Sequence, residues 1–255
     1  MEGFHTVFPA TDTRKSGNAI HSNTFERMHN LLYVEALGAD DPDFVPFNES
    51  QALVFNTIRD AALEENPVLG PRIYFADGPG GTGKTFVFNA LLGRVSMKGE
   101  VAIAVTSSGT ASLLLKGGRT AHYMFQIPLD FTTTTMCKMN PRSEIATFIK
   151  RAKIIVWDEC SMVSKNLIET VNRSFQNILG NSAPFGGCFI VFGGDFCQVL
   201  PIIRGASRST IISQCSNRAS FWPQARSMRL TVNMRVQQAL QSNDEILASE
   251  LQHFA

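Results

Sequence analysis

Hydrophobic positions along the chain fall into short continuous runs separated by longer amphipathic stretches. Runs of strand length lie at residues 72–76, 101–106, 153–158, 188–193 and 227–232. Such runs are typical of strands in a parallel sheet that is covered on both faces. Residues 161–179 instead repeat apolar positions at helical spacing, and Gly180 marks the predicted helix end. The alternation predicts an α/β fold with a mostly parallel sheet and helices on both faces.

The same pattern divides the chain into three parts. Residues 1–46 are polar and weakly periodic, and we expect them to form an N-terminal extension of low order. Residues 47–236 hold all the predicted strands, together with a first helix from Asn48 to near Pro67. Residues 237–255 are expected to form a C-terminal helical tail.

The composition is that of a folded globular protein, because 44% of the 255 residues are hydrophobic and 18% are charged. No run of 18 apolar residues predicts a membrane span, and the N-terminus does not resemble a signal peptide. Five cysteines show neither a C-x-x-C pair nor metal-ligand spacing with the histidines, so we expect reduced thiols and no structural zinc. A formal net charge of +1 provides no overall attraction for nucleic acid, so any DNA contact must come from a local groove.

The strongest chemical signal follows the first predicted strand. Residues 78–85, here called the phosphate loop, fit the pattern of Gly, four residues, Gly, Lys, then Ser or Thr. They are Gly78, Pro79, Gly80, Gly81, Thr82, Gly83, Lys84 and Thr85. Glycines let successive backbone N–H groups point at an anion, and the following helix adds its positive N-terminal end. Lys84 would then reach the β- and γ-phosphates of a nucleotide, and the Thr85 hydroxyl would bind Mg²⁺.

A second signal is the pair of acids, Asp158 and Glu159, that ends the third apolar run. A solvated turn is the alternative, but large apolar residues rarely precede such a turn. In phosphate-loop hydrolases the first acid holds Mg²⁺, and a following glutamate can deprotonate the attacking water. We therefore assign Asp158 to the metal and Glu159 to the water.

Three further polar residues have both a functional and a structural interpretation. Gln51 closes a capping box with Asn48, or it contacts the adenine edge of a nucleotide. Gln198 follows the run at residues 188–193, and it either senses the γ-phosphate or makes ordinary loop hydrogen bonds. Arg235 follows the last predicted strand, and it either contacts phosphate oxygens or lies on the surface. The residues alone leave these alternatives open.

The segments after the second predicted strand should share a rim with the phosphate loop, because the carboxyl ends of parallel strands meet at one edge. Ser108 in this region either touches a second ligand or caps the next helix. Residues 116–122 are predicted to form a basic, flexible loop, in which a lone His122 is more typical of a structural residue.

Taken in order, the motifs resemble the first motor domain of the Pif-one (petite integration frequency) helicases, a RecD-related branch of superfamily 1. They are GPGGTGKT, VTSSGTASLLLKGGRTAHYMF, IIVWDECSM, VFGGDFCQVLPI and LTVNMRV. The versions encoded by Helitron-type transposable elements resemble them most. The resemblance covers residues 47–236 and implies a RecA-like phosphate-loop NTPase domain.

The resemblance also implies a role in ATP hydrolysis for each candidate residue. It assigns Gln51 to the adenine side, Lys84 to the phosphates, Thr85 and Asp158 to Mg²⁺, Glu159 to water activation, Gln198 to γ-phosphate sensing and Arg235 to transition-state charge. Thr106, Thr120 and His122 fall in segments that line the single-stranded DNA path in the family. The implied activity is an ATP-dependent 5′→3′ DNA helicase of repair, recombination and telomere maintenance, in the nucleus or, alternatively, the mitochondrion.

The sequence departs from the family pattern in three places. Cys160 stands where related sequences usually carry Ala, and Cys197 stands where they commonly carry Arg. The chain also ends twenty residues after Arg235, before the family's second motor domain. We therefore expect weak ATP·Mg²⁺ binding, slow hydrolysis and no unwinding by this chain alone, unless a partner supplies that domain. The alternatives are a non-catalytic nucleotide- or DNA-binding fragment and a motor that acts on protein.

Overall fold

The computed structural model describes residues 45–64, 72–130, 132–198, 201, 205 and 207–241. Most of the predicted N-terminal extension, residues 1–46, lies outside these residues. So does most of the predicted tail, residues 237–255, of which residues 237–241 belong to the helix α9. Among the described residues, no helix is long and apolar enough to cross a membrane.

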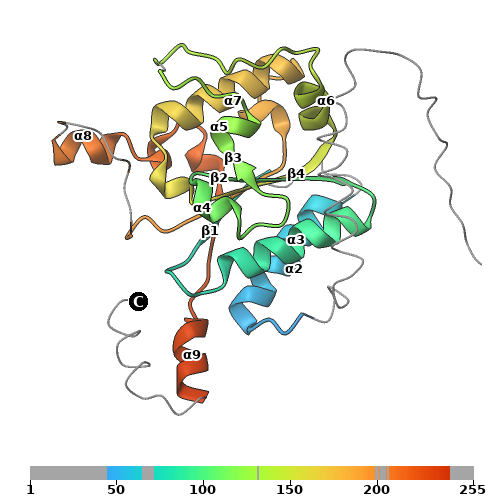
Figure 1. Ribbon diagram of the computed structural model, residues 1–255, viewed down its shortest axis with the longest axis vertical. Helices are drawn as coiled ribbons and strands as arrows, with labels where there is room; N and C mark the ends of the chain where they lie inside the picture. The colour runs from blue at the N-terminus through green and yellow to red at the C-terminus, as the bar shows by residue number, and fades with distance from the viewer. Residues whose placement is uncertain are drawn as a thin grey trace, which may run out of the picture.

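Six parallel strands form one sheet with the order β3-β2-β4-β5-β1-β6 (Figure 1). The strands are β1 (Ile73–Asp77), β2 (Val101–Thr106), β3 (Arg119–Thr120), β4 (Ala152–Asp158), β5 (Ile190–Gly194) and β6 (Arg226–Arg229). Five of them coincide with the apolar runs to within a few residues. The predicted parallel α/β fold is confirmed.

The strand β3 corrects the prediction of a flexible loop at residues 116–122. Arg119 pairs with Val105, and Thr120 pairs with Thr106, so β3 extends the sheet beside β2. Two polar residues at a sheet edge carry no apolar pattern, and for this reason the strand has no signal in the sequence.

Helices cover both faces of the sheet, as predicted (Figure 1). The helices α2 (Glu49–Leu63) and α3 (Lys84–Met97) pack on one face; α5 (Ala121–Met124), α6 (Glu144–Arg151) and α7 (Lys165–Leu179) pack on the other. The remaining helices among the described residues are α4 (Gly109–Ser112), α8 (Arg208–Ser213) and α9 (Met234–Gln241). Single 3₁₀ turns are η2 (Cys160–Met162), η3 (Pro184–Gly187), η4 (Ser216–Arg218) and η5 (Trp222–Gln224).

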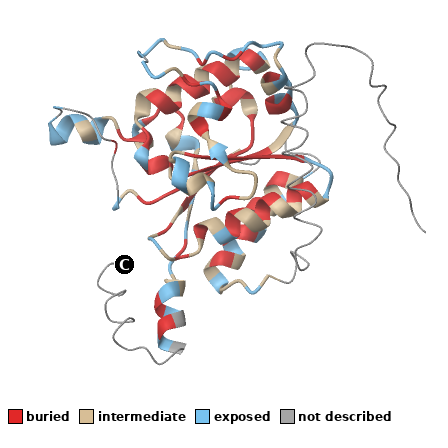
Figure 2. Cartoon of the chain, in the orientation of Figure 1, coloured by how far each residue is buried: buried red, intermediate tan, exposed pale blue. Residues whose placement is uncertain are grey.

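The strand β1 shows why the sequences of the strands are continuous apolar runs. Ile73 and Phe75 belong to the core beneath α7, whereas Tyr74 and Ala76 belong to the core beneath α2 and α3. All four side chains are buried, because successive residues of a strand point to opposite faces and both faces are covered (Figure 2).

Polar caps set the ends of the longer helices. α7 begins at Lys165, not at Ser161 as the apolar pattern predicts, because the Ser164 hydroxyl accepts a hydrogen bond from the N–H of Leu167. α7 ends at Gly180 as predicted, and this residue adopts the left-handed conformation with φ 62°. The end of α2 is Leu63, a few residues before the predicted position.

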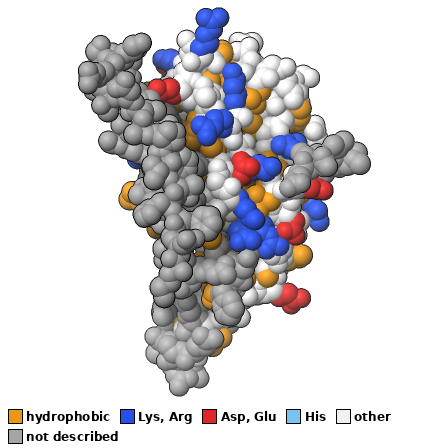
Figure 3. Space-filling view, turned by 90° about the vertical axis from the view of Figure 1, so that its right-hand side faces the viewer, with side chains coloured by type: hydrophobic (Ala, Val, Ile, Leu, Met, Phe, Trp, Pro, Cys, Tyr) orange, Lys and Arg blue, Asp and Glu red, His pale blue; other side chains and the backbone are white. Residues whose placement is uncertain are grey.

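Several Lys and Arg side chains are exposed on one face of the molecule (Figure 3). Figure 3 shows this face, which is the right-hand side of Figure 1. Arg94 lies in the last turn of α3, and Lys150 and Arg151 lie in the last turn of α6. Cations at a helix C-terminus offset the negative end of the helix dipole, so these residues have a structural explanation.

Candidate functional site

The phosphate loop joins β1 to α3 in the way that its sequence predicts. Gly81 and Gly83 are left-handed, with φ values of 87° and 81°. A Cβ atom on Gly81 would lie 2.6 Å from Oδ1 of Asn233, and one on Gly83 would lie 2.5 Å from Nε2 of Gln51. Both positions therefore favour glycine for their conformation, and any side chain there would also have to displace Asn233 or Gln51.

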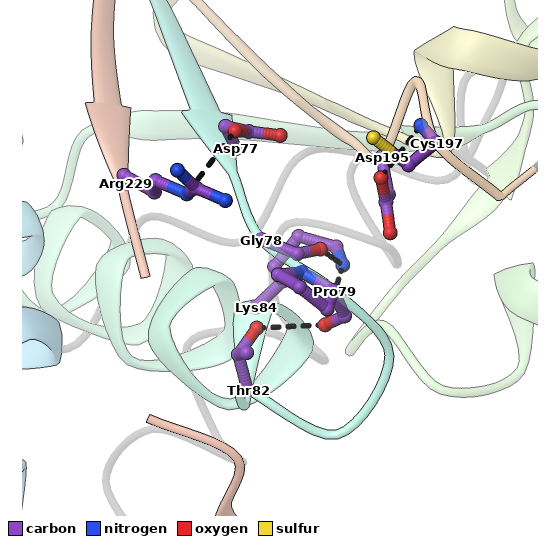
Figure 4. Close-up of polar contacts among 8 residues, drawn as sticks. All are labelled: Asp77, Gly78, Pro79, Thr82, Lys84, Asp195, Cys197 and Arg229. Atoms are coloured by element: carbon purple, nitrogen blue, oxygen red, sulfur yellow. Dashed lines mark hydrogen bonds and ion pairs between the residues drawn. The ribbon is translucent and has the colours of Figure 1, made fainter. Parts of the chain in front are cut away.

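The carbonyl oxygens of the loop are bound by donors of the protein. Nζ of Lys84 donates to the carbonyls of Gly78 and Pro79, and the second of these contacts measures 3.3 Å (Figure 4). The Thr82 hydroxyl also donates to the Pro79 carbonyl, at 2.9 Å. Nε2 of Gln51 donates to the Thr82 carbonyl at 3.0 Å.

The other loop carbonyls are bound as well. The donors are Nδ2 of Asn233 to Gly80 at 3.4 Å, the N–H of Met234 to Gly81 at 2.9 Å and the N–H of Val87 to Gly83 at 3.1 Å. A trans peptide points its N–H away from its C=O, so the N–H groups of Gly81 and Gly83 point away from these donors. Within the described part of the chain, neither N–H group has a partner. The loop is thus a preformed nest of amide groups that suits an anion.

Thr85 and Asp158 lie side by side, as expected for two ligands of one metal. Oγ1 of Thr85 and Oδ2 of Asp158 are 3.4 Å apart, and Oδ1 of Asp158 accepts the N–H of Glu159 at 2.8 Å. Burial raises the pKa of the Asp158 carboxyl, although the nearby Lys84 ammonium opposes this. Mg²⁺ is commonly held by one or two protein oxygens with phosphate and water oxygens, so this pair fits the ion. In the described residues, no cluster of three or more His, Cys, Asp or Glu side chains forms a separate metal site.

Glu159 follows β4 in the left-handed conformation, with φ 57°. Its carboxyl is half-buried, and burial is the main reason that its pKa is raised. The negative charges of Asp158 and Asp195 raise this pKa further, and Lys84 opposes them. A carboxylate whose pKa lies closer to neutrality is a better proton acceptor, which suits the role predicted for Glu159.

The turn after β5 brings Gln198 to the phosphate loop. A Cβ atom on Gly80 would lie 2.9 Å from Nε2 of Gln198, so the amide group lies against the loop backbone. Asp195, which is 5% exposed, shapes this turn because its Oδ1 accepts the N–H of Cys197 at 2.8 Å (Figure 4). Cys197 is exposed, whereas the other four cysteines are buried.

The start of α9 also lies against the phosphate loop. A Cβ atom on Gly81 would lie 3.2 Å from Cδ of Arg235, so the stem of this predicted phosphate ligand packs on the loop. Sequence reasoning missed Asn233, which caps α9 and binds Gly80. An Asn directly before a helical stretch is the signal that would have found its capping role.

Gln51 makes the structural contact that the sequence left open. Its Oε1 accepts the N–H of Asn48 at 3.1 Å, and its own N–H donates to Oδ1 of Asn48 at 3.0 Å. The capping box is therefore confirmed. Gln51 is 1% exposed, and the same side chain holds Thr82 of the loop; its contact with adenine stays a prediction.

The three residues predicted to contact DNA lie in one region, since Thr106 and Thr120 pair between β2 and β3. The Thr106 side chain is fully buried, and its hydroxyl donates to the carbonyl of Ser108 at 2.6 Å, so it positions the loop instead of facing solvent. Thr120 caps α5. His122 is half-buried, and burial lowers the pKa of its imidazole.

Ser108 also has the structural role that the sequence offered as one alternative. Its hydroxyl accepts the N–H of Ala111 at 3.2 Å and so caps α4. The two threonines and Ser108 therefore shape the rim on which a DNA strand is predicted to lie, and their contacts with DNA stay predictions.

Two curated helicases are similar to this chain in sequence. ATP-dependent DNA helicase PIF1 of Danio rerio is 27% identical over 212 residues, which are 80% of this chain and 31% of that protein. ATP-dependent DNA helicase RRM3 of Saccharomyces cerevisiae is 29% identical over 133 residues, which are 51% of this chain and 18% of that protein. The chain thus spans less than a third of the length of these relatives.

Solved structures agree with the fold. A Pif1 helicase from Bacteroides in complex with ADP-AlF3 and single-stranded DNA superposes with a TM-score of 0.62 at 22% identity, over 80% of this chain and 47% of the other. The sequence model of the PIF1-like helicases matches residues 46–255. Because this match spans most of the chain and contains all five motifs, the protein belongs to the PIF1-like helicase family.

Proposed function

We propose that this chain carries the nucleotide site of an ATP-dependent DNA helicase and that it binds and hydrolyses ATP. One observation carries the proposal. The carbonyls of residues 78–83 are all bound by protein donors, which leaves inward amide groups next to the paired oxygens of Thr85 and Asp158. A triphosphate with its metal ion matches this arrangement.

Each predicted residue then has a chemical role. Lys84 would exchange the carbonyls of Gly78 and Pro79 for the β- and γ-phosphates, because phosphate is a stronger acceptor for an ammonium group. Thr85 and Asp158 would hold Mg²⁺, which supplies neutralisation of phosphate charge when bound. Glu159 accepts the proton of the attacking water at its carboxylate.

Three more residues would complete the nucleotide site. Gln198 and Arg235 lie against the loop, where the γ-phosphate would be sensed and stabilised. Gln51 holds the loop at Thr82 and is the proposed adenine-side contact.

We propose that single-stranded DNA lies over the rim formed by the ends of β2 and β3. Thr120 and His122 are the proposed DNA contacts on this rim. Thr106 is buried beneath it and holds the loop that follows β2. Burial lowers the pKa of the His122 imidazole and so favours its neutral form, which suits a hydrogen-bonding contact with DNA. The same proposal includes movement in the 5′→3′ direction and roles in repair, recombination and telomere maintenance. It also includes a nuclear or mitochondrial location.

The chain spans less than a third of the length of the helicases that it resembles. We propose that these residues supply nucleotide hydrolysis, and that unwinding also requires the second motor domain of such helicases. Motors of this kind move by closing a cleft between two domains around ATP. We expect slow hydrolysis by the 255-residue chain, with unwinding only when a second motor domain is supplied in trans.

The test is ATP binding and hydrolysis by the purified chain, with and without a single-stranded oligonucleotide. We expect Lys84→Ala to lose nucleotide affinity, and Glu159→Gln to keep affinity while losing turnover by about a hundredfold or more. Lys98→Ala is a matched control, because Lys98 is exposed just after the other end of α3.

The other outcomes decide between the alternatives. Nucleotide binding without turnover supports a non-catalytic binding fragment, for which the substitution of Cys197 is the motivating feature. Turnover that no oligonucleotide affects, with no salt-sensitive DNA binding, supports a motor that acts on protein. The absence of any nucleotide binding would contradict the proposal as a whole.

A further inference from the structure

The first residues of α9 are joined to the phosphate loop by several polar contacts. Nδ2 of Asn233 donates to the Gly80 carbonyl at 3.4 Å, and the N–H of Met234 donates to the Gly81 carbonyl at 2.9 Å. Met234 is in turn held from α2, since Nδ2 of Asn48 lies 3.1 Å from its sulfur. Figure 1 shows α9 extending away from the sheet, so the loop is contacted by a helix that leads out of the core.

Asn233 uses both ends of its side-chain amide. Its oxygen accepts the N–H groups of Arg235 at 3.0 Å and Val236 at 3.4 Å, which caps α9. A helix cap needs only this oxygen. The nitrogen makes the additional bond to Gly80, so one planar group fixes the distance between the helix start and the loop.

The Gly80 carbonyl needs such a tether because both residues of its peptide are glycines. Glycine rotates freely through conformations that other residues avoid, so a Gly80–Gly81 peptide can flip at little cost. A flip would turn the Gly81 N–H out of the nest and replace it with a carbonyl that repels phosphate. Holding the carbonyl at Asn233 prevents this.

We propose that Asn233 is a positioning residue of the nucleotide site. It keeps the Gly81 N–H turned inward and sets the stem of Arg235 against Gly81, where a Cβ atom would lie 3.2 Å away. The inference rests on the proposed function in one respect, that the loop binds a nucleoside triphosphate. It predicts that turnover depends on the amide nitrogen of Asn233 as well as on the helix cap.

The experiment separates the two ends of the side chain. Asn233→Ser keeps an oxygen that can cap α9, but its side chain is too short to reach Gly80 as well. Asn233→Ala removes both contacts. We expect both variants to lower kcat for ATP by about tenfold, and to lower the preference for a non-hydrolysable ATP analogue over ADP in calorimetry.

Two further measurements identify the mechanism. In an Arg235→Ala background, Asn233→Ser should lower kcat by a smaller factor than it does in the wild-type chain, because the two residues act as a unit. Hydrogen exchange of the nucleotide-free chain should become faster at residues 78–83 in Asn233→Ser, and this readout does not depend on activity. Ser207→Ala, which removes the exposed cap of α8, is the matched control for loss of a cap and should change neither.

The inference is overturned if Asn233→Ser has the kcat and the hydrogen exchange of the wild-type chain and only Asn233→Ala is defective. In that case Asn233 acts only as a helix cap. A wild-type chain that binds no nucleotide would instead contradict the proposed function. In that case unchanged exchange in Asn233→Ser overturns the tether, and faster exchange supports it.

Discussion

Asp158 combines deep burial with a negative charge. It is 3% exposed, and the nearest ammonium group, that of Lys84, is bound to loop carbonyls. Burial dominates the pKa of this carboxyl and raises it. A buried carboxylate without a full counter-charge disfavours folding, so the site is held in place by the rest of the core.

We expect Asp158→Asn to raise the melting temperature of the nucleotide-free chain, measured in a chelating buffer, by a few degrees. The amide can keep the contacts to Glu159 and Thr85 without a buried charge. The same variant should lose Mg²⁺-dependent ATP binding. Asp130→Asn, a change at an exposed carboxylate, is the control and should leave the melting temperature unchanged.

The sign of the pH dependence follows from the raised pKa of Asp158. Between the ordinary carboxyl pKa and the raised one, the folded chain binds more protons than the unfolded chain, so this group makes stability fall as pH rises. The difference in stability between Asp158→Asn and the wild-type chain should therefore be smallest below this pH window and largest above it. A variant that is less stable than wild type at neutral pH would refute the argument.

At the residue scale, the sequence predicted identities better than contacts. Lys84, Thr85 and Asp158 lie together because a fixed motif and a strand end determine their places. Asn233 was missed because its contact with Gly80 joins residues 153 positions apart, and no local pattern encodes such a pair. The burial of Thr106 was missed because an apolar run does not predict whether the polar residue at its end is buried or exposed.

Among the elements, β5 approaches its neighbours closely at its two final glycines. A Cβ atom on Gly193 would lie 2.4 Å from Cε2 of Phe88 in α3 and 2.7 Å from Oδ1 of Asp158 in β4. A Cβ atom on Gly194 would lie 3.1 Å from the backbone nitrogen of Ser161. These close approaches let β5, α3 and the end of β4 converge on the nucleotide site.

Gly193→Ala should destabilise the chain by about 1–3 kcal/mol, because the added methyl group overpacks the interface between β5 and α3. It should also weaken nucleotide binding by displacing Asp158. Gly109→Ala is the control, since a Cβ atom there meets nothing within 4 Å. Chemical denaturation measures both variants, and equal stabilities for the two would show that the core adjusts without cost.

The elements that the sequence predicts are those that are stabilised by burial of apolar side chains or by contacts between residues close in sequence. β1, β2, β4 and β5 were found because both faces of the sheet are covered and their sequences are continuously apolar. β3 was not found, because Arg119 and Thr120 form a strand only through pairing with β2. The start of α7 was placed early because the residues before Ser164 fit the same helical pattern, and only the cap distinguishes them.

For the whole molecule, the parallel sheet brings the ends of β1, β4 and β5 to one edge, where Lys84, Asp158 and Gln198 follow them. An ion pair of 3.7 Å between Asp77 and Arg229 joins the ends of β1 and β6 beside the loop (Figure 4). The basic last turns of α3 and α6 lie at the opposite edge, because these helices lead directly into the starts of β2 and β4. The proposed nucleotide site therefore lies at one edge of the sheet, and the basic helix ends lie at the other.

We expect the purified chain to show ATP hydrolysis that a single-stranded oligonucleotide stimulates, but no displacement of a labelled strand from a forked duplex. The reason is that the described residues form one sheet, whereas the proposed movement needs two domains that close around the nucleotide. A strand-displacement assay measures this, with Glu159→Gln as the control for contaminating helicase. ATP-dependent displacement by the wild-type chain alone would show that a single domain suffices.

The distribution of the cysteines has a practical consequence. Burial raises the pKa of the thiols of Cys137, Cys160, Cys188 and Cys215, which makes them slow to react. Cys197 is exposed and belongs to the same turn as Gln198, beside Gly80. A maleimide dye added to the unaltered chain should therefore attach at one position, and a change in its emission on addition of ATP would test the proposed nucleotide site in real time.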